Sequence, residues 1–178
     1  SADWLARMGP GTDLHPDFGP SYGAQSVPYG IPVTVVRGAP RVPVEFDYAD
    51  ESDSVRYHLG PATLIEGRAD AAGDRHAIVV DADSCTLFET WDTRCVPQGS
   101  PSCTWRAGSG AVFPLDANLR RPDGWTSADA AGLAILPGLV RYDEVFGSEP
   151  IRHAFRFTVR ATNGYVFPAS HRAGSTGG

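Results

Sequence analysis

Lysine is absent from this chain of 178 residues, so all 15 basic side chains are arginines. A protein without lysine cannot form a Schiff base through a lysine amine. The arginines are scattered, with only Arg120 and Arg121 adjacent, and the net charge is −6. Nucleic-acid and anionic-membrane surfaces need clustered basic residues, so the sequence predicts neither partner.

Long apolar runs are also missing, although 42% of the residues are hydrophobic. No stretch approaches the roughly 18 apolar residues of a membrane-spanning helix, so we expect no membrane span. A chain of this length can bury about 70% of its unfolded surface. We therefore expect one globular domain over residues 1–172 with an N-terminal arm at 1–30, followed by a flexible Gly/Ser-rich tail at 173–178.

Cysteine is scarce, and none of the three stands in the C-x-x-C spacing of zinc and redox sites. Cys95 and Cys103 bracket a turn-rich spacer, which predicts a disulfide between them. Cys85 lies in an alternating apolar run, which predicts a buried thiol. A disulfide favours an oxidising compartment, so we expect a secreted or extracellular protein.

Several catalytic and cofactor motifs are missing as well. The chain has no G-x-S-x-G elbow, no dinucleotide or phosphate-binding glycine loop, and no H-E-x-x-H. We therefore expect no organic cofactor. Calcium is the one ion we consider, either at Asp17 or at Asp81 with Asp83, although a turn is the first explanation of these carboxylates and a calcium site the second.

Short β-rich segments punctuated by glycine and proline dominate what is present. The pattern predicts a mainly β, single-domain sandwich or jelly roll with one short interior helix and long ordered loops. Residues 76–81 and 85–91 form the expected hairpin, and Pro32 and Pro43 favour edge positions for their strands. The predicted helix covers Ser127 to Leu136, with Thr126 as N-cap and Asp129 completing a capping box. The other predicted strands cover residues 31–36, 42–46, 111–115, 153–159 and 165–167.

Glu89 is the first candidate catalytic residue. Strand alternation places it on the apolar face with Cys85, Leu87 and Trp91, where lost hydration raises the pKa of a carboxyl towards that of a general acid. The alternative is an ion pair with an arginine.

Two histidines occupy similar positions. His76 and His153 each begin a predicted strand on its apolar face, so parallel pairing of those strands would bring both imidazoles to one sheet end. They could act there as acid, base or metal ligand. A hydrogen-bonded structural histidine explains each of them alone.

Further candidates lie in loops. His15 and Asp17 share one short loop stiffened by proline, and Asp129 is either a helix cap or a second catalytic carboxylate. Glu144, beside Arg141, belongs either to a solvated salt-bridge cluster or to a cleft rim. The candidate ligand-binding side chains are His15, His76, Trp125, Tyr142 and Glu144.

Several blocks resemble a family of mostly exported bacterial proteins that has no settled activity. They are residues 14–19 (LHPDFG), 124–133 (GWTSADAAGL), 137–144 and 152–154. The resemblance implies export and no particular reaction. Members continue past the position of His171, so the resemblance also implies a further C-terminal segment, with the Gly-rich end as a truncation point.

These features favour an exported protein that acts on an extracellular polysaccharide or cell-surface glycan. As a hydrolase it would use paired carboxylates, with Glu89 as acid and Asp17 or Asp129 as nucleophile or base, and His153 as a further catalytic candidate. The alternative is a non-catalytic glycan-binding or structural module, in which aromatic side chains stack on the ligand.

Overall fold

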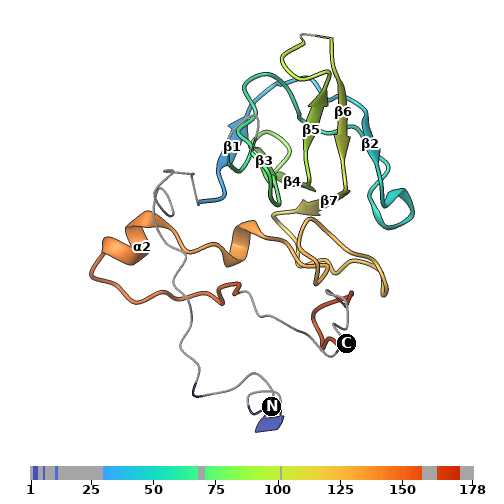
Figure 1. Cartoon of the computed structure of the whole chain (residues 1–178). Helices are drawn as coiled ribbons and strands as arrows, with labels where there is room; N and C mark the ends of the chain where they lie inside the picture. Colours follow the sequence, from blue (N-terminus) through green and yellow to red (C-terminus); the bar gives the residue numbers. More distant parts are fainter. Residues whose placement is uncertain are drawn as a thin grey trace.

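The computed structural model describes residues 2, 3, 6, 11, 30–67, 71–100, 102–157 and 164–172. Within them the protein is mainly β, and its strands form two sheets (Figure 1). The large sheet has the order β1-β3-β4-β7 and the small sheet β2-β6-β5. The strands are β1 (Val33–Val36), β2 (Val44–Phe46), β3 (Ala77–Asp81), β4 (Thr86–Trp91), β5 (Arg94–Val96), β6 (Thr104–Ala107) and β7 (Ser109–Pro114).

The large sheet is the middle one of three layers. On one face, Val79 and Phe88 pack against Tyr57 and against side chains of the small sheet such as Phe46. On the other face, Ile78, Leu87 and Phe113 pack against Ala128 and Ile135. The chain after β7, yellow to orange in Figure 1, supplies this third layer below the strands. The β-sandwich-like fold expected from the strand pattern is confirmed.

The predicted hairpin and the edge positions are also confirmed. β3 and β4 pair antiparallel, with Asp81 opposite Thr86. β1 is an edge strand of the large sheet and β2 is an edge strand of the small sheet. The two strands do not pair with each other, because β1 pairs parallel with β3 and β2 pairs parallel with β6.

The predicted helix over Ser127 to Leu136 is wrong. The segment consists of turns, and the nearest helices are η2 (Leu136–Gly138) and α2 (Tyr142–Phe146). Gly132 takes a φ of +73°, which an α-helix does not allow. The Thr126 hydroxyl contacts the carbonyl of Ser127 instead of capping a helix. Side chains satisfy the backbone here: the Ser127 hydroxyl lies 2.6 Å from the carbonyl oxygens of both Asp129 and Leu133.

Three smaller expectations are wrong as well. Cys85 is exposed in the β3–β4 turn, with a φ of +52°. The described parts of the last two predicted strands, 153–157 and 165–167, form no strand. Phe155 and Phe157 are exposed, whereas alternation would bury them. A strand needs a partner as well as a pattern, and no edge of either sheet pairs with these described residues.

The predicted disulfide is confirmed. Cys95 and Cys103 are bonded and join β5 to the segment before β6. Within the described part of the chain, no helix is both long and apolar enough to cross a membrane.

Candidate functional site

Three side chains stand at one end of the large sheet. His76 directly precedes β3, Trp91 ends β4 and Ser109 begins β7. Trp91 is opposite Ser109 in the register, and Ala77 is opposite Thr90. The antiparallel pairing therefore places all three residues at the same sheet end.

A pocket of about 420 Å³ opens at this end, a volume typical of small-molecule sites. Its wall combines the sheet end with the segment after Trp125, together with residues of the C-terminal segment. The pocket is lined by Tyr48, Glu51, Asp74, His76, Trp91, Ser109, Thr126, Ser127, Ala128, Asp129, Ala130, Arg156, His171 and Arg172.

Trp91 and Tyr48 form an aromatic wall of this pocket. Their ring centroids lie 6.3 Å apart. The Trp91 indole N–H donates to the Asp74 carboxylate at 3.2 Å. The indole also approaches Gly108 so closely that a Cβ there would overlap the ring. The contact with Gly108 and the hydrogen bond to Asp74 thus fix the orientation of Trp91.

His76 is buried between two hydrogen-bond acceptors. Its Nδ1 lies 2.6 Å from Glu66 Oε2, and its Nε2 lies 3.2 Å from the Ala128 carbonyl oxygen. Burial alone would raise the pKa of Glu66, but hydrogen bonds from the ring and backbone of His76 outweigh it and hold that pKa below its usual value. The Glu66 carboxylate is therefore ionised near neutral pH and anchors the ring.

The segment 128–130 forms the opposite wall. The Asp129 carboxylate, predicted as a helix cap or a catalytic group, accepts from the Arg156 guanidinium at 2.9 Å. His171 Nδ1 lies 2.9 Å from the Ala130 carbonyl oxygen, and His171 Nε2 lies 3.7 Å from a Glu51 carboxylate oxygen. Each wall residue is thus tied to a neighbouring segment.

Glu89 lies behind the pocket and does not line it. Its side chain is fully buried and accepts the backbone N–H groups of Ile135 and Leu136 at 2.9–3.0 Å. Burial raises the pKa of this carboxyl to about 7, against the lowering effect of those N–H groups and of His76. The predicted burial of Glu89 and the rise of its pKa are confirmed. Its partners among the described residues are backbone N–H groups and not an arginine, so the alternative of an ion pair is not found there.

The other predicted site residues that the structure describes lie outside this pocket. His153 Nε2 lies 2.9 Å from the carboxylate of Glu144 on α2, so His76 and His153 do not meet at one sheet end. Tyr142 is exposed and stacks with Phe146 at 4.6 Å. Trp125 packs beneath the Arg121 guanidinium. His15 and Asp17 lie outside the described residues.

Glu144 and His153 form an ion pair with Arg141 beside it. The Arg141 backbone N–H and the His153 ring hold the pKa of Glu144 below its usual value. The pKa of His153 is raised by the Ala154 carbonyl and by Glu144. The contact of 3.0 Å between Arg141 and Glu144 completes a salt-bridge cluster, which was one of the two interpretations of these residues.

Asp81 and Asp83 form a turn. Asp81 accepts from the Ser84 hydroxyl at 2.7 Å and from Arg41 at 3.0 Å, and these donors hold its pKa far below its usual value. Asp83 accepts from Arg37 and from the Gly38 N–H. No group of three metal-ligating side chains gathers anywhere in the described ranges.

Sequence reasoning missed most of the pocket. Trp91 could have been found, because the predicted hairpin register places it across from His76. Tyr48, Glu51, Asp74, Arg156 and His171 come from separate segments with no motif. Only tertiary contacts bring them to the sheet end, and no local pattern encodes those contacts.

Comparison with family models, curated proteins and solved structures finds no match to this chain. The chemistry of the pocket is therefore inferred from its own residues.

Proposed function

We propose that this protein is a glycan-binding module that holds a short stretch of polysaccharide in the Trp91 pocket. The observation that carries the proposal is the aromatic wall of Trp91 and Tyr48, surrounded by charged and hydroxyl side chains. A sugar ring offers apolar C–H faces to an aromatic ring and a rim of hydroxyls to polar groups. Aromatic rings with a fixed orientation lose little conformational entropy when they bind.

The polar rim supports the same ligand class. Three carboxylates and two arginines line the pocket, so it offers both acceptors and donors to hydroxyl groups. The Asp129–Arg156 pair and the Trp91–Asp74 contact hold these groups in place before a ligand arrives. A pocket with both donors and acceptors already in place suits a neutral polyol, whose hydroxyl groups both donate and accept, better than it suits a charged ligand.

Binding without hydrolysis is the better supported form of the proposal. Hydrolysis by paired carboxylates needs a protonated carboxyl in contact with the glycosidic oxygen. Among the described residues, the carboxyl whose pKa burial raises is that of Glu89, and its side chain is fully buried and does not line the pocket. In the pocket itself, Asp129 accepts from a guanidinium and Glu51 accepts the Thr126 N–H.

An extracellular location fits this proposal. The Cys95–Cys103 disulfide is of the kind that persists in oxidising compartments, where polysaccharides are also found.

Isothermal titration with cellohexaose, laminarihexaose, xylohexaose and chitohexaose tests the proposal. We expect one of them to bind and Tyr48→Ala to weaken its affinity by about tenfold. Tyr142→Ala is the matched control, because Tyr142 is an exposed tyrosine outside the pocket. Failure of all four sugars to bind, or equal loss in both variants, would contradict the proposal. If the wild type releases new reducing ends from any of the four sugars, the protein is a glycan hydrolase and the binding-module proposal is wrong.

A further inference from the structure

Two histidines contact the same short segment of the pocket wall, and His76 is the one that lies within hydrogen-bond distance of both of its partners. His76 lies between the Glu66 carboxylate and the Ala128 carbonyl, at 2.6 and 3.2 Å. His171 lies between the Glu51 carboxylate and the Ala130 carbonyl, at 3.7 and 2.9 Å. Each imidazole therefore joins an acidic side chain to a backbone carbonyl of the segment 128–130.

All four partners of these rings are acceptors. A neutral imidazole carries one N–H, whereas an imidazolium carries two. Only the imidazolium can donate to a carboxylate and to a carbonyl at the same time. At His76, loss of the proton leaves one ring nitrogen with its lone pair facing an acceptor at hydrogen-bond distance, so one of its two contacts turns from attractive to repulsive. At His171, loss of the proton removes the charge attraction to Glu51 across 3.7 Å.

Ala128, Asp129 and Ala130 all line the Trp91 pocket. We propose that protons gate this pocket: doubly protonated His76 and His171 clasp the segment 128–130 into the binding wall, and their deprotonation releases it. The inference rests on the proposed glycan-binding function and adds its regulation. Ligand binding is then favoured in acidic surroundings, because a ligand that needs the closed wall binds together with the protons that close it.

Charged groups of both signs surround the two rings. His76 faces Glu66 and interacts electrostatically with Glu89 from β4, while Arg156 lies near Glu66 and is paired with Asp129. His171 faces Glu51 and is followed by Arg172.

Protonation of Glu89 opposes protonation of His76. Glu89 takes up its own proton near pH 7 and so removes a negative charge close to His76 as the pH falls. Titration of Glu89 acts directly on the backbone N–H groups of Ile135 and Leu136, which donate to its carboxylate. The N–H groups of Asp129 and Gly132 donate to other acceptors, so their exchange can be measured separately from the effect of Glu89.

Amide hydrogen exchange tests the clasp without any ligand. We compare protection factors, corrected for intrinsic exchange, at about pH 5.5 and pH 8.5, which bracket the usual range of histidine. The backbone N–H groups of Asp129 and Gly132 are the reporters, because the first donates to the Ser127 hydroxyl and the second donates to the Asp129 carbonyl, so both bonds end on Asp129. Losing one hydrogen bond from the wall should lower their protection by about tenfold at the higher pH.

Single variants assign the effect to the two rings. His76→Gln and His171→Gln should each reduce the difference between the two pH values, since glutamine does not titrate. His153→Gln is the matched control, because His153 pairs with Glu144 outside the pocket. Unchanged wild-type protection across the two pH values, or an equal effect of His153→Gln, would overturn the clasp.

The imidazole ¹⁵N signals of the wild type decide the case if His76→Gln does not fold. Both ring nitrogens of His76 should carry protons at about pH 5.5, and a neutral His76 ring there would overturn the clasp.

Titration with the same four hexasaccharides at the two pH values then separates proton gating from glycan binding. Affinity at least tenfold higher at the lower pH supports gating, and equal affinity overturns it. No binding at either pH contradicts glycan binding alone, while exchange still decides the clasp.

Discussion

Glu89 shows how backbone N–H groups can hold a buried carboxylate. Its two oxygens accept the Ile135 and Leu136 N–H groups, which no helix or strand satisfies at this point. The charged acceptor thus replaces the missing backbone partners of the segment that covers the sheet. The cost of burying the charge remains visible in the pKa of about 7.

This pKa makes a prediction about stability and pH. The folded state raises the pKa of Glu89 from 4.5 to about 7, so it binds the proton more tightly than the unfolded chain does. The resulting stabilisation is complete below pH 4.5 and is lost as the pH rises through 7. In Glu89→Gln, the free energy of unfolding relative to wild type should therefore rise by about 3 kcal/mol between pH 4.5 and pH 8.

Urea unfolding at the two pH values measures this difference, and subtraction of the wild type cancels the other titrating groups. Glu149→Gln is the control, because Glu149 is exposed and pairs only with Arg152 among the described residues. A parallel pH dependence for Glu89→Gln and wild type would show that Glu89 keeps its ordinary acidity.

At the scale of elements, the turns after Thr126 replace the expected helix for a clear reason. Ser127 is buried, and its hydroxyl accepts the Asp129 N–H while its one O–H can donate to the Asp129 or the Leu133 carbonyl. Ser109 adds a bond of 2.7 Å to the Ser127 carbonyl. Side chains thus compete successfully with helical hydrogen bonds, as serine commonly does.

Two neighbouring substitutions distinguish the turns from a helix. Ser127→Ala should lower the free energy of unfolding by about 1–3 kcal/mol, because it leaves buried backbone groups without a partner. Thr126→Ala should cost less than about 0.5 kcal/mol, since Thr126 caps no helix. Denaturant titration measures the free energy of unfolding of both variants. A larger loss for Thr126→Ala than for Ser127→Ala would contradict the turns and support a helix with Thr126 as its N-cap.

The disulfide also acts at the scale of elements. Cys95 in β5 and Cys103 before β6 close a loop with a sequence separation of 8. Cys103→Ser should lower the free energy of unfolding by about 2–3 kcal/mol, because the loop entropy returns to the unfolded chain. Chemical denaturation measures the loss. Thiol titration of unreduced wild type should find Cys85 alone, and three reactive thiols would contradict the bridge.

At the scale of the whole molecule, the features that the sequence predicted correctly are those determined by residues close to one another in the chain. Alternation and turn residues identified the β3–β4 hairpin and the burial of Glu89. Prolines identified the edge strands, and the spacer between Cys95 and Cys103 identified the disulfide. Each of these features depends on residues within about ten positions of one another, where pattern and propensity operate.

The features that the sequence did not predict depend on distant contacts. Asp74 is recognisable as a pocket residue only when its bond to the Trp91 indole is known. Arg156 reaches Asp129, 27 residues away, from a segment whose alternation predicted a strand. The capping pattern at Thr126 was locally sound, but burial of the segment against the sheet overrode it. A single sequence holds no record of such tertiary competition.

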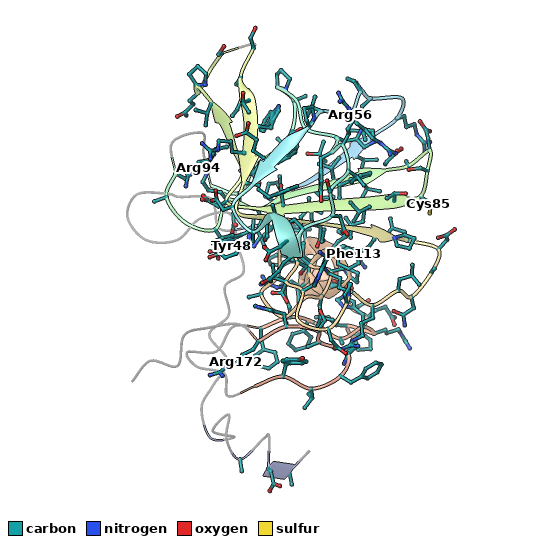
Figure 2. All side chains as sticks on the ribbon, turned by 90° about the vertical axis from the view of Figure 1, so that its right-hand side faces the viewer. Tyr48, Arg56, Cys85, Arg94, Phe113 and Arg172 are labelled. Carbon is teal, nitrogen blue, oxygen red and sulfur yellow. A yellow bond between two sulfur atoms is a disulfide. The ribbon has the colours of Figure 1, made fainter. Side chains whose placement is uncertain are left out.

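The exposed thiol in the β3–β4 turn has a practical consequence. β4 runs from this turn to Trp91, so Cys85 and the aromatic wall stand at opposite ends of one strand. Six residues of extended chain separate them by about 20 Å. Figure 2 shows Cys85 and Tyr48 on opposite sides of the molecule. A maleimide linker at Cys85 would therefore immobilise every molecule in one orientation on a sensor surface, with the pocket facing the solution.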